Sequence, residues 1–235
     1  MFVQMPLKIG LRSEACFETF VTEQENIALA LNSLQNALMK NSGSAFYLYG
    51  SGGAGKTHLL QAACRFVTEQ EKASVYLPLS DDSLPLIPDV LVGLEQMPLV
   101  CLDDIDVIIG EAKWELALAN LLTKSSVQGH TVILSGKNSI NSWEIVTQEL
   151  LKALMNVLPI EIMPLSDKKE LITALMRHSS RLGFELPKEV GNYLIKQFST
   201  DLQELLAVLK MLEQATLVEK RRLTLPFVKD VLNQN

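Results

Sequence analysis

A glycine-rich run near residue 50 has the residue types and spacing needed to hold phosphate groups. Gly50, Gly55, Lys56 and Thr57 satisfy the pattern G-x-x-x-x-G-K-[ST] within the run GSGGAGKT. Glycines let backbone N–H groups converge on a phosphate, and the positive end of a following helix adds to the attraction. The lysine brings a charge to the β- and γ-phosphates, and the threonine hydroxyl is a ligand for Mg²⁺. We therefore predict that ATP or ADP binds here with Mg²⁺.

The flanks of this run argue against a chance glycine-rich turn. An apolar, strand-like run precedes it and a segment with helical spacing follows it, which is the context that the motif requires. The residues predicted here to contact the nucleotide are Gly50, Gly52, Gly53, Ala54, Gly55, Lys56, Thr57 and His58.

A pair of acidic residues supplies the second half of such a site. Asp103 and Asp104 end the apolar run LVCL, roughly fifty residues after the glycine-rich run. We predict that Asp103 holds Mg²⁺ through water and that Asp104 polarises a catalytic water. Two adjacent aspartates can also be simple turn formers, but their place after the phosphate-binding run favours the metal site.

The chain alternates short apolar runs with longer segments of helical spacing up to about residue 163. The predicted strands are 45–49, 74–78, 98–102, 131–135 and 158–163, and they are apolar nearly throughout, as strands covered on both faces are. Predicted helices between them include 56–70 and 113–124. This alternation predicts an α/β fold with a five-stranded parallel sheet.

After residue 163 only helical patterns remain. Predicted helices lie within 164–183, 187–198, 200–220 and 225–234. We expect Pro187 at the first position of the second helix and a capping box from Thr200 to Gln203 at the start of the third. The predicted division is an N-terminal tail (1–15), a nucleotide-binding core (16–163) and a small all-helical domain (164–235).

Composition restricts the classes of partner. The net charge is −6 and the sequence pI is about 5.2, so we expect no direct sequence-specific binding of DNA. The three cysteines lack the spacing of a zinc site and suggest reduced thiols. We see neither a secretory signal nor an apolar run of the roughly 20 residues that span a bilayer. The expectation is a cytoplasmic protein without a membrane partner.

Several phrases resemble AAA+ proteins of the DnaA family, and among these the Hda regulators most of all. They are FETFVTEQEN, GKTHLLQA, IPDVLVGLE, RLGFELPKEVGNYLIKQ and RRLTLPFVKDVL. The resemblance covers essentially the whole chain and implies a P-loop AAA+ core with a helical lid. It implies that Phe20 and Val21 border the adenine pocket. It also implies negative regulation of replication initiation. In that role the protein acts together with the DNA sliding clamp and promotes hydrolysis of the ATP bound to the initiator DnaA. The resemblance also allows the chain to form a homodimer.

The N-terminus is similar to the clamp-binding peptide of the Hda regulators. The segment QMPLKI places Gln4, Met5, Leu7 and Ile9 on that peptide, and a glutamine with apolar anchors suits a peptide that binds in a groove. Met5 stands where the family has leucine. Without the resemblance, the same residues are more typical of a frayed tail that carries a few apolar side chains.

Three positions depart from the family pattern. Lys137 occupies the polar sensor position after the fourth strand, with Ser135 and Asn138 as polar neighbours; a lysine cannot accept a hydrogen bond from a catalytic water. Ala153 aligns with the arginine finger, beside Lys152, and no arginine occurs between Arg65 and Arg177. Gln203 replaces the sensor arginine of the lid, where Arg177 and Arg181 are the nearby arginines.

These departures predict at most a weak ATPase. They leave two alternatives to the regulator. One is a P-loop adaptor or loader that recruits DnaA or helicase without stimulating hydrolysis. The other is a self-sufficient AAA+ ATPase, which would need an arginine finger elsewhere in the chain.

Overall fold

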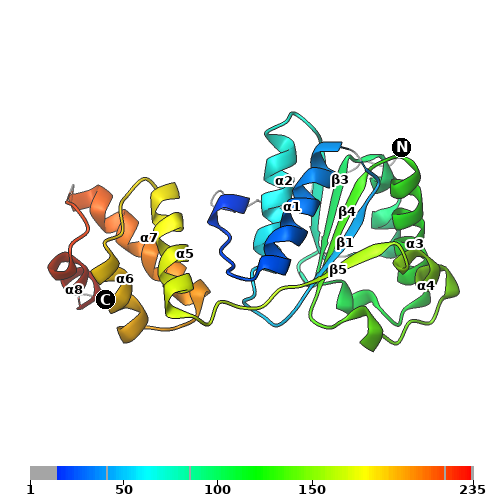
Figure 1. Ribbon diagram of the computed structural model, residues 1–235. Coiled ribbons are helices and arrows are strands. Elements are labelled where there is room, and N and C mark those ends of the chain that lie inside the picture. Colours follow the sequence, from blue (N-terminus) through cyan, green and yellow to red (C-terminus); the bar gives the residue numbers. More distant parts are fainter. Residues whose placement is uncertain (1–14, 41, 85, 220, 234–235) are drawn as a thin grey trace.

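The computed structural model describes residues 15–40, 42–84, 86–219 and 221–233, which form an α/β core and a helical lid (Figure 1). The core contains η1 (Phe17–Thr19), α1 (Glu25–Lys40), β1 (Ala45–Tyr49), α2 (Lys56–Thr68), β2 (Ser74–Pro78), η2 (Pro88–Leu91), η3 (Leu94–Gln96), β3 (Leu99–Asp103), η4 (Ile105–Ile108), α3 (Ala112–Val127), β4 (Thr131–Gly136), η5 (Ile140–Ser142), α4 (Gln148–Leu154) and β5 (Val157–Glu161). The lid contains α5 (Lys168–Arg181), α6 (Lys188–Gln197), α7 (Leu202–Glu219) and α8 (Leu225–Asn233).

The five strands form one parallel sheet in the order β2-β3-β4-β1-β5. Helices α1 and α2 cover one face, and α3 and α4 cover the other (Figure 1). Strands β3 and β4 are buried along their whole length, which explains their unbroken apolar sequences. The predicted five-stranded parallel sheet is confirmed, and the predicted strand ends differ from the observed ones by no more than two residues.

This topology places the ends of β1, β3 and β4 at one edge of the sheet. In a parallel sheet with crossover helices, the loops after the carboxyl ends of the strands form the binding crevice. The glycine-rich run follows β1, the two aspartates end or follow β3, and Lys137 follows β4. Residues far apart in sequence therefore reach the same edge.

The lid packs its four helices around a separate apolar cluster that includes Leu175, Leu194, Leu209 and Phe227. The helical character predicted for this part is confirmed. Two details of the prediction are wrong. Pro187 is the N-cap of α6 and not its first residue. The carboxylate of Asp201, and not the hydroxyl of Thr200, accepts hydrogen bonds from the first backbone N–H groups of α7, because aspartate caps helices at least as well as threonine.

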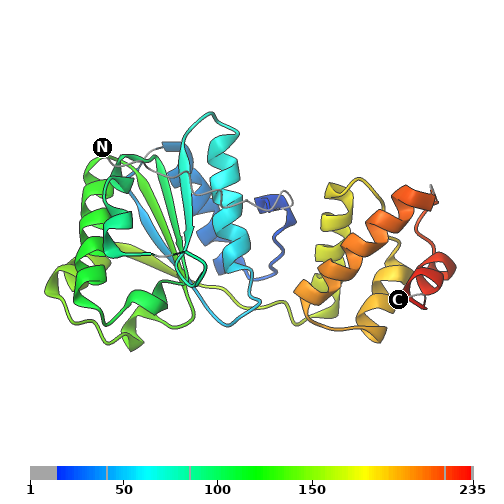
Figure 2. The same cartoon turned by 180° about the vertical axis from the view of Figure 1, so that it is seen from behind.

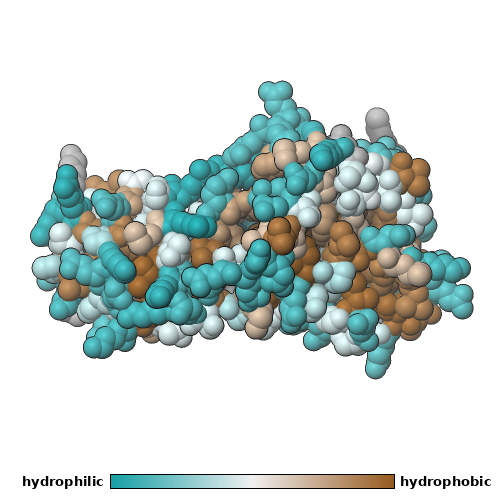
Figure 3. All heavy atoms as spheres, viewed as in Figure 1, coloured by the Kyte–Doolittle hydropathy of each residue, from teal (hydrophilic) through white to brown (hydrophobic). Residues whose placement is uncertain are grey.

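None of the helices in the described ranges is long and apolar enough to span a membrane. On the face that Figure 3 shows, polar and apolar side chains are mixed, and an apolar region lies over the α4 end of the core. The exposed apolar side chains in α4 and next to it include Val146, Leu151 and Met155.

Candidate nucleotide-binding site

The glycine-rich run forms a tight loop between β1 and α2. β1 ends at Tyr49 and α2 begins at Lys56. Gly50 has a φ of 146°, and a Cβ atom there would lie 2.0 Å from the carbonyl oxygen of Ile162. Gly55 has a φ of 94°, and a Cβ there would lie 3.0 Å from the ring of Phe20. Both positions therefore require glycine for the backbone to turn from strand to helix.

Lys56, the first residue of α2, follows this loop and is 8% exposed. Its ammonium group donates hydrogen bonds to the carbonyl oxygens of Gly50 and Ser51, at 2.7 and 2.8 Å. Burial lowers the pKa of Lys56, while the carboxylates of Asp104 and Asp103 act in the opposite direction. A buried cation held by two neutral carbonyls is electrostatically suited to receive a phosphate.

A cavity of about 310 Å³ opens between the loop and the lid. The loop contributes one wall, from Gly52 to His58, and Asp104 and Lys137 lie at the ends of the neighbouring strands. The opposite wall is mostly apolar and comes from the N-terminal segment and the lid: Thr19, Phe20, Val21, Met163, Leu165, Ala174, His178, Leu202, Gln203 and Leu206. The cavity thus has a charged end that suits phosphates and an apolar end that suits a planar base.

The two aspartates after the buried strand differ in their surroundings. Asp103 is 3% exposed, and its carboxylate accepts hydrogen bonds from the hydroxyls of Tyr76, at 2.7 Å, and of Ser135. Burial, and after it the negative charge of Asp103, raises the pKa of Tyr76. Asp104 lines the cavity and accepts a hydrogen bond from Ser80 at 2.7 Å. It is therefore Asp104 whose carboxylate faces the space where a nucleotide would lie.

The donor set here fits a Mg²⁺ ion held mainly by nucleotide phosphates and water. Thr57 and Asp104 both line the cavity together with Lys56. Mg²⁺ commonly takes one or two protein ligands and completes its coordination with phosphate oxygens and water. In such a site the ion neutralises phosphate charge. The role of Asp103 through a water stays a prediction, since its carboxylate lies behind the cavity wall.

Lys137 is the cation at the β4 side of the cavity. Its backbone N–H donates to the carboxylate of Asp106 at 2.5 Å. Burial, and after it the charge of Asp106, raises the pKa of Tyr47. Neither of the polar alternatives to Lys137 lines the cavity. Ser135 binds Asp103, and the carbonyl of Asn138 accepts a hydrogen bond from Tyr47 at 2.6 Å.

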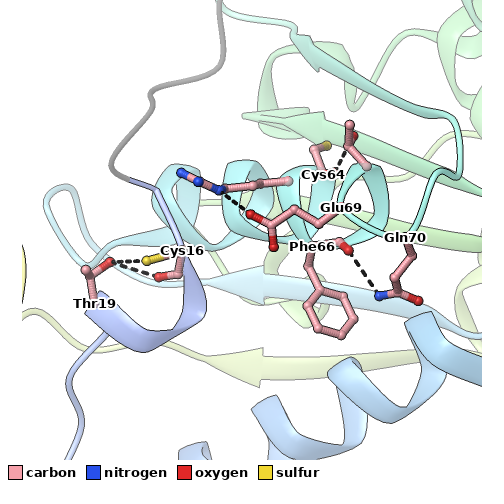
Figure 4. Close-up of polar contacts among 8 residues, drawn as sticks. Cys16, Thr19, Cys64, Phe66, Glu69 and Gln70 are labelled. Atoms are coloured by element: carbon pink, nitrogen blue, oxygen red, sulfur yellow. Dashed lines mark hydrogen bonds and ion pairs between the residues drawn. The ribbon is translucent and has the colours of Figure 1, made fainter. Parts of the chain in front are cut away.

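Residues 16–23, which we call the bridging segment, form hydrogen bonds with both the core and the lid. Thr19 donates through its hydroxyl to the carbonyl of Cys16 at 2.9 Å (Figure 4). His58 of α2 places Nε2 2.9 Å from the same carbonyl and 3.1 Å from the Thr19 hydroxyl. The segment carries Phe20 and Val21, the predicted base-contacting residues, to the apolar end of the cavity.

Two models of known families match the chain. The model of the lid domain of Hda matches residues 167–232, and the model of the bacterial DnaA ATPase domain matches residues 11–83. Each match falls on the part of the structure that its description names. The chain is an AAA+ protein of the DnaA/Hda family.

Solved structures agree with this family at the level of the fold. Domain III of the replication initiation protein DnaA from Thermotoga maritima superposes with a TM-score of 0.71 at 18% identity, over 96% of this chain and 98% of that one. AMPPCP-bound DnaA from Aquifex aeolicus superposes with a TM-score of 0.66 at 23% identity, over 86% of this chain and 66% of that one. A replication initiator DnaA bound to AMPPCP and single-stranded DNA gives 0.67 at 21%, over 90% and 69%.

In this DnaA/Hda-family chain, most of the predicted site residues meet at the cavity. Phe20, Val21, Asp104, Lys137, Gln203 and the loop from Gly52 to His58 all line it. Gly50 does not; its carbonyl binds Lys56 instead. The sequence reasoning missed Thr19 and His178. Both come from positions where only the tertiary fold reveals proximity to the loop.

The two positions that align with arginines needed for hydrolysis, Gln203 and Ala153, lie in different parts of the structure. Gln203, which the sequence places where the lid arginine would be, lines the cavity. Ala153 is partly buried against the core cluster on the α4 side, with Leu151 exposed on the same helix. Gln4, Met5, Leu7 and Ile9, the predicted clamp-binding residues, lie outside the described part of the chain.

Proposed function

We propose that this chain binds ADP or ATP with Mg²⁺ and regulates chromosomal replication initiation. In this proposal it acts, as the Hda regulators do, with the DNA sliding clamp on the initiator DnaA, and it restrains initiation by promoting hydrolysis of DnaA-bound ATP. The observation that carries the proposal is the cavity between the loop wall and the lid wall. It occurs in a chain whose two parts match the DnaA ATPase and Hda lid models.

In this function the loop from Gly52 to Thr57 holds the phosphates, and Lys56 supplies the charge. Phe20 and Val21 contact the base, Thr57 holds Mg²⁺ directly and Asp103 holds it through water, and Asp104 orients a water. The chain's own turnover is weak because the cavity wall has Gln203 and Lys137 where hydrolysis calls for a lid arginine and an acceptor for the attacking water. The N-terminal residues Gln4 to Ile9 dock on the clamp.

The central experiment measures hydrolysis of ATP bound to DnaA in the presence of clamp-loaded DNA, with and without this protein. We expect stimulation, and we expect Lys56→Ala to weaken it because nucleotide binding orders the cavity. Gln4→Ala should weaken stimulation in reactions that depend on the clamp and should leave any clamp-independent stimulation unchanged. If nucleotide affinity were unchanged in Lys56→Ala, the assignment of the phosphate loop would be wrong.

Ala153 favours a second function, that of an adaptor which recruits DnaA or helicase without driving hydrolysis. An arginine supplied in trans raises phosphoryl-transfer rates by about 10³–10⁵-fold, and alanine supplies no charge. Binding of DnaA without stimulated hydrolysis would support the adaptor. Ala153→Arg should then raise hydrolysis at least tenfold, roughly, whereas Leu151→Arg on the exposed side of the same helix should not.

A further inference from the structure

The lid places no lysine or arginine in the described wall of the cavity. Its described lining residues are Leu165, Ala174, His178, Leu202, Gln203 and Leu206. None of them supplies the permanent positive charge of an arginine. Arg177 of the lid acts on the site indirectly, because it donates hydrogen bonds to backbone carbonyls of the bridging segment.

Arg177 lies on α5 and faces the bridging segment. Its Nη1 donates hydrogen bonds to the carbonyl oxygens of Glu18 and Phe20, at 3.1 and 2.9 Å. About two turns earlier on the same helix, the carboxylate of Glu170 accepts a hydrogen bond from the backbone N–H of Glu23 at 3.1 Å. The lid therefore holds the bridging segment at three backbone groups.

The core holds the same segment from its other side. His58 contacts the Cys16 carbonyl and the Thr19 hydroxyl, and its ring packs edge-on to that of His178 in α5, with centroids 5.7 Å apart. Both ribbon views place the segment between α5 and the helices of the core (Figures 1 and 2). A displacement of the lid must therefore either move the segment or break these hydrogen bonds.

We propose that the bridging segment couples the position of the lid to the base end of the nucleotide cavity, with Arg177 as the positioning residue. The inference rests on the proposed nucleotide binding. Arg177 fixes the carbonyls of Glu18 and Phe20, and the side chains of Thr19, Phe20 and Val21 between and beside them line the cavity. Occupancy by a base and closure of the lid then favour each other, as linkage requires.

The base and the phosphates would contact different parts of the cavity, so a role of Arg177 at the base end can be distinguished from a general effect on stability. The bridging segment lies at the apolar end, whereas phosphates are held by the loop and Lys56. Loss of Arg177 should therefore weaken binding of ADP but leave binding of pyrophosphate, which has no base, nearly unchanged. A substitution that merely destabilised the protein would weaken both ligands.

The experiment is calorimetric titration of the full chain with ADP and with pyrophosphate, each in the presence of Mg²⁺. Arg177→Ala should raise the Kd for ADP about three- to tenfold, the loss expected for charge-assisted hydrogen bonds at an exposed site. The Kd for pyrophosphate should stay within about twofold. Arg177→Lys, which keeps a cationic donor, should recover part of the ADP affinity.

Two controls make the outcomes distinguishable. Arg181→Ala removes an exposed arginine one turn away that makes no described hydrogen bond to the segment, and both affinities should stay unchanged. Lys56→Ala should weaken both ligands. Equal ADP affinity in Arg177→Ala and the parent protein, or equal losses for ADP and pyrophosphate, would overturn the coupling. A parent protein that bound neither ligand would instead refute the proposed nucleotide binding, and the coupling with it.

A second measurement needs no ligand. Hydrogen exchange of the backbone amides in residues 17–23 should accelerate in Arg177→Ala, while amides in the interior of α2 and α7 keep their protection. Unchanged exchange in the segment would show that Arg177 does not hold it, and would overturn the proposal independently of nucleotide.

Discussion

Lys56 and Glu115 are two buried charged side chains that the core satisfies in different ways. Lys56 is 8% exposed, donates to two carbonyls and lines the cavity. Glu115 is fully buried, and its carboxylate accepts hydrogen bonds from the backbone N–H groups of Gly110, Val146 and Thr147 and from the hydroxyl of Thr147. Both charged side chains form hydrogen bonds with backbone groups, but of the two only Lys56 lines the cavity in which a ligand would fit.

This difference in hydrogen bonding indicates which of the two side chains serves binding and which serves folding. The carboxylate of Glu115 is saturated by donors at 2.8–3.1 Å and ties the start of α3 to the loop before α4. It has no capacity left for a ligand, so its hydrogen bonds stabilise the fold. The ammonium of Lys56 donates to two neutral carbonyls. An anion such as a phosphate would be a stronger partner for it. We therefore expect substitutions at Glu115 to affect folding and substitutions at Lys56 to affect binding.

Glu115→Ala should have the largest effect. It leaves several buried N–H groups without an acceptor, and we expect a loss of about 3 kcal/mol in the free energy of unfolding. Urea denaturation measures it. Glu111→Ala is the matched control, because Glu111 is exposed at the N-cap of the same helix without a side-chain cap, and the expected change is below about 0.5 kcal/mol. Similar losses in both variants would contradict the role of Glu115.

The glycines around Lys56 test whether the loop also contributes to folding. Gly50→Ala places a Cβ against the carbonyl of Ile162 at a positive φ, so we expect a loss of about 2–3 kcal/mol. Gly52→Ala is the control: a Cβ there meets no atom within 4 Å, and stability should change by less than about 0.5 kcal/mol. Thermal unfolding of the two variants decides the matter, and an unchanged Tm in Gly50→Ala would refute the close approach.

The pH dependence of stability isolates the charge of Glu115. Burial acts to raise the pKa of Glu115, but the hydrogen bonds from Gly110, Thr147 and Val146 outweigh it, and the pKa is lowered from its ordinary value of 4.5. A lowered pKa means that this stabilisation is complete above pH 4.5 and is lost as the pH falls through the folded-state pKa. The difference in unfolding free energy between the parent and Glu115→Gln, about 1–2 kcal/mol at pH 7, should therefore shrink in acid. A constant difference would contradict this account.

The sequence predicted one member of this pair and not the other, for a physical reason. Lys56 belongs to a contiguous run in which a strand, a turn and a helix bring all the phosphate contacts together. Every donor to Glu115 apart from Gly110 is about thirty residues away, at Val146 and Thr147. No local pattern encodes that pairing, and a glutamate in a helical sequence reads as an exposed residue.

The same distinction applies to the two walls of the cavity. The loop wall and the adjacent Asp104 follow from motifs, as does the parallel sheet that carries them. The lid wall depends on contacts such as those from Arg177 to Glu18 and Phe20, 159 and 157 residues apart. A capping-box pattern in the sequence predicts Thr200 as the cap of α7, but Asp201 competes for the same N–H groups.

Lys56→Met completes the comparison with the smallest effect on stability. The substitution removes a desolvated charge and retains apolar volume, so we expect the free energy of unfolding of the nucleotide-free protein to change by less than about 1 kcal/mol. The carbonyls of Gly50 and Ser51 lose a donor but lie at the loop, where water replaces it. ADP affinity should nevertheless fall by about 10- to 100-fold. Paired urea and calorimetric measurements test both halves. A loss of stability as large as that of Glu115→Ala would mean that Lys56, too, is held mainly for the fold.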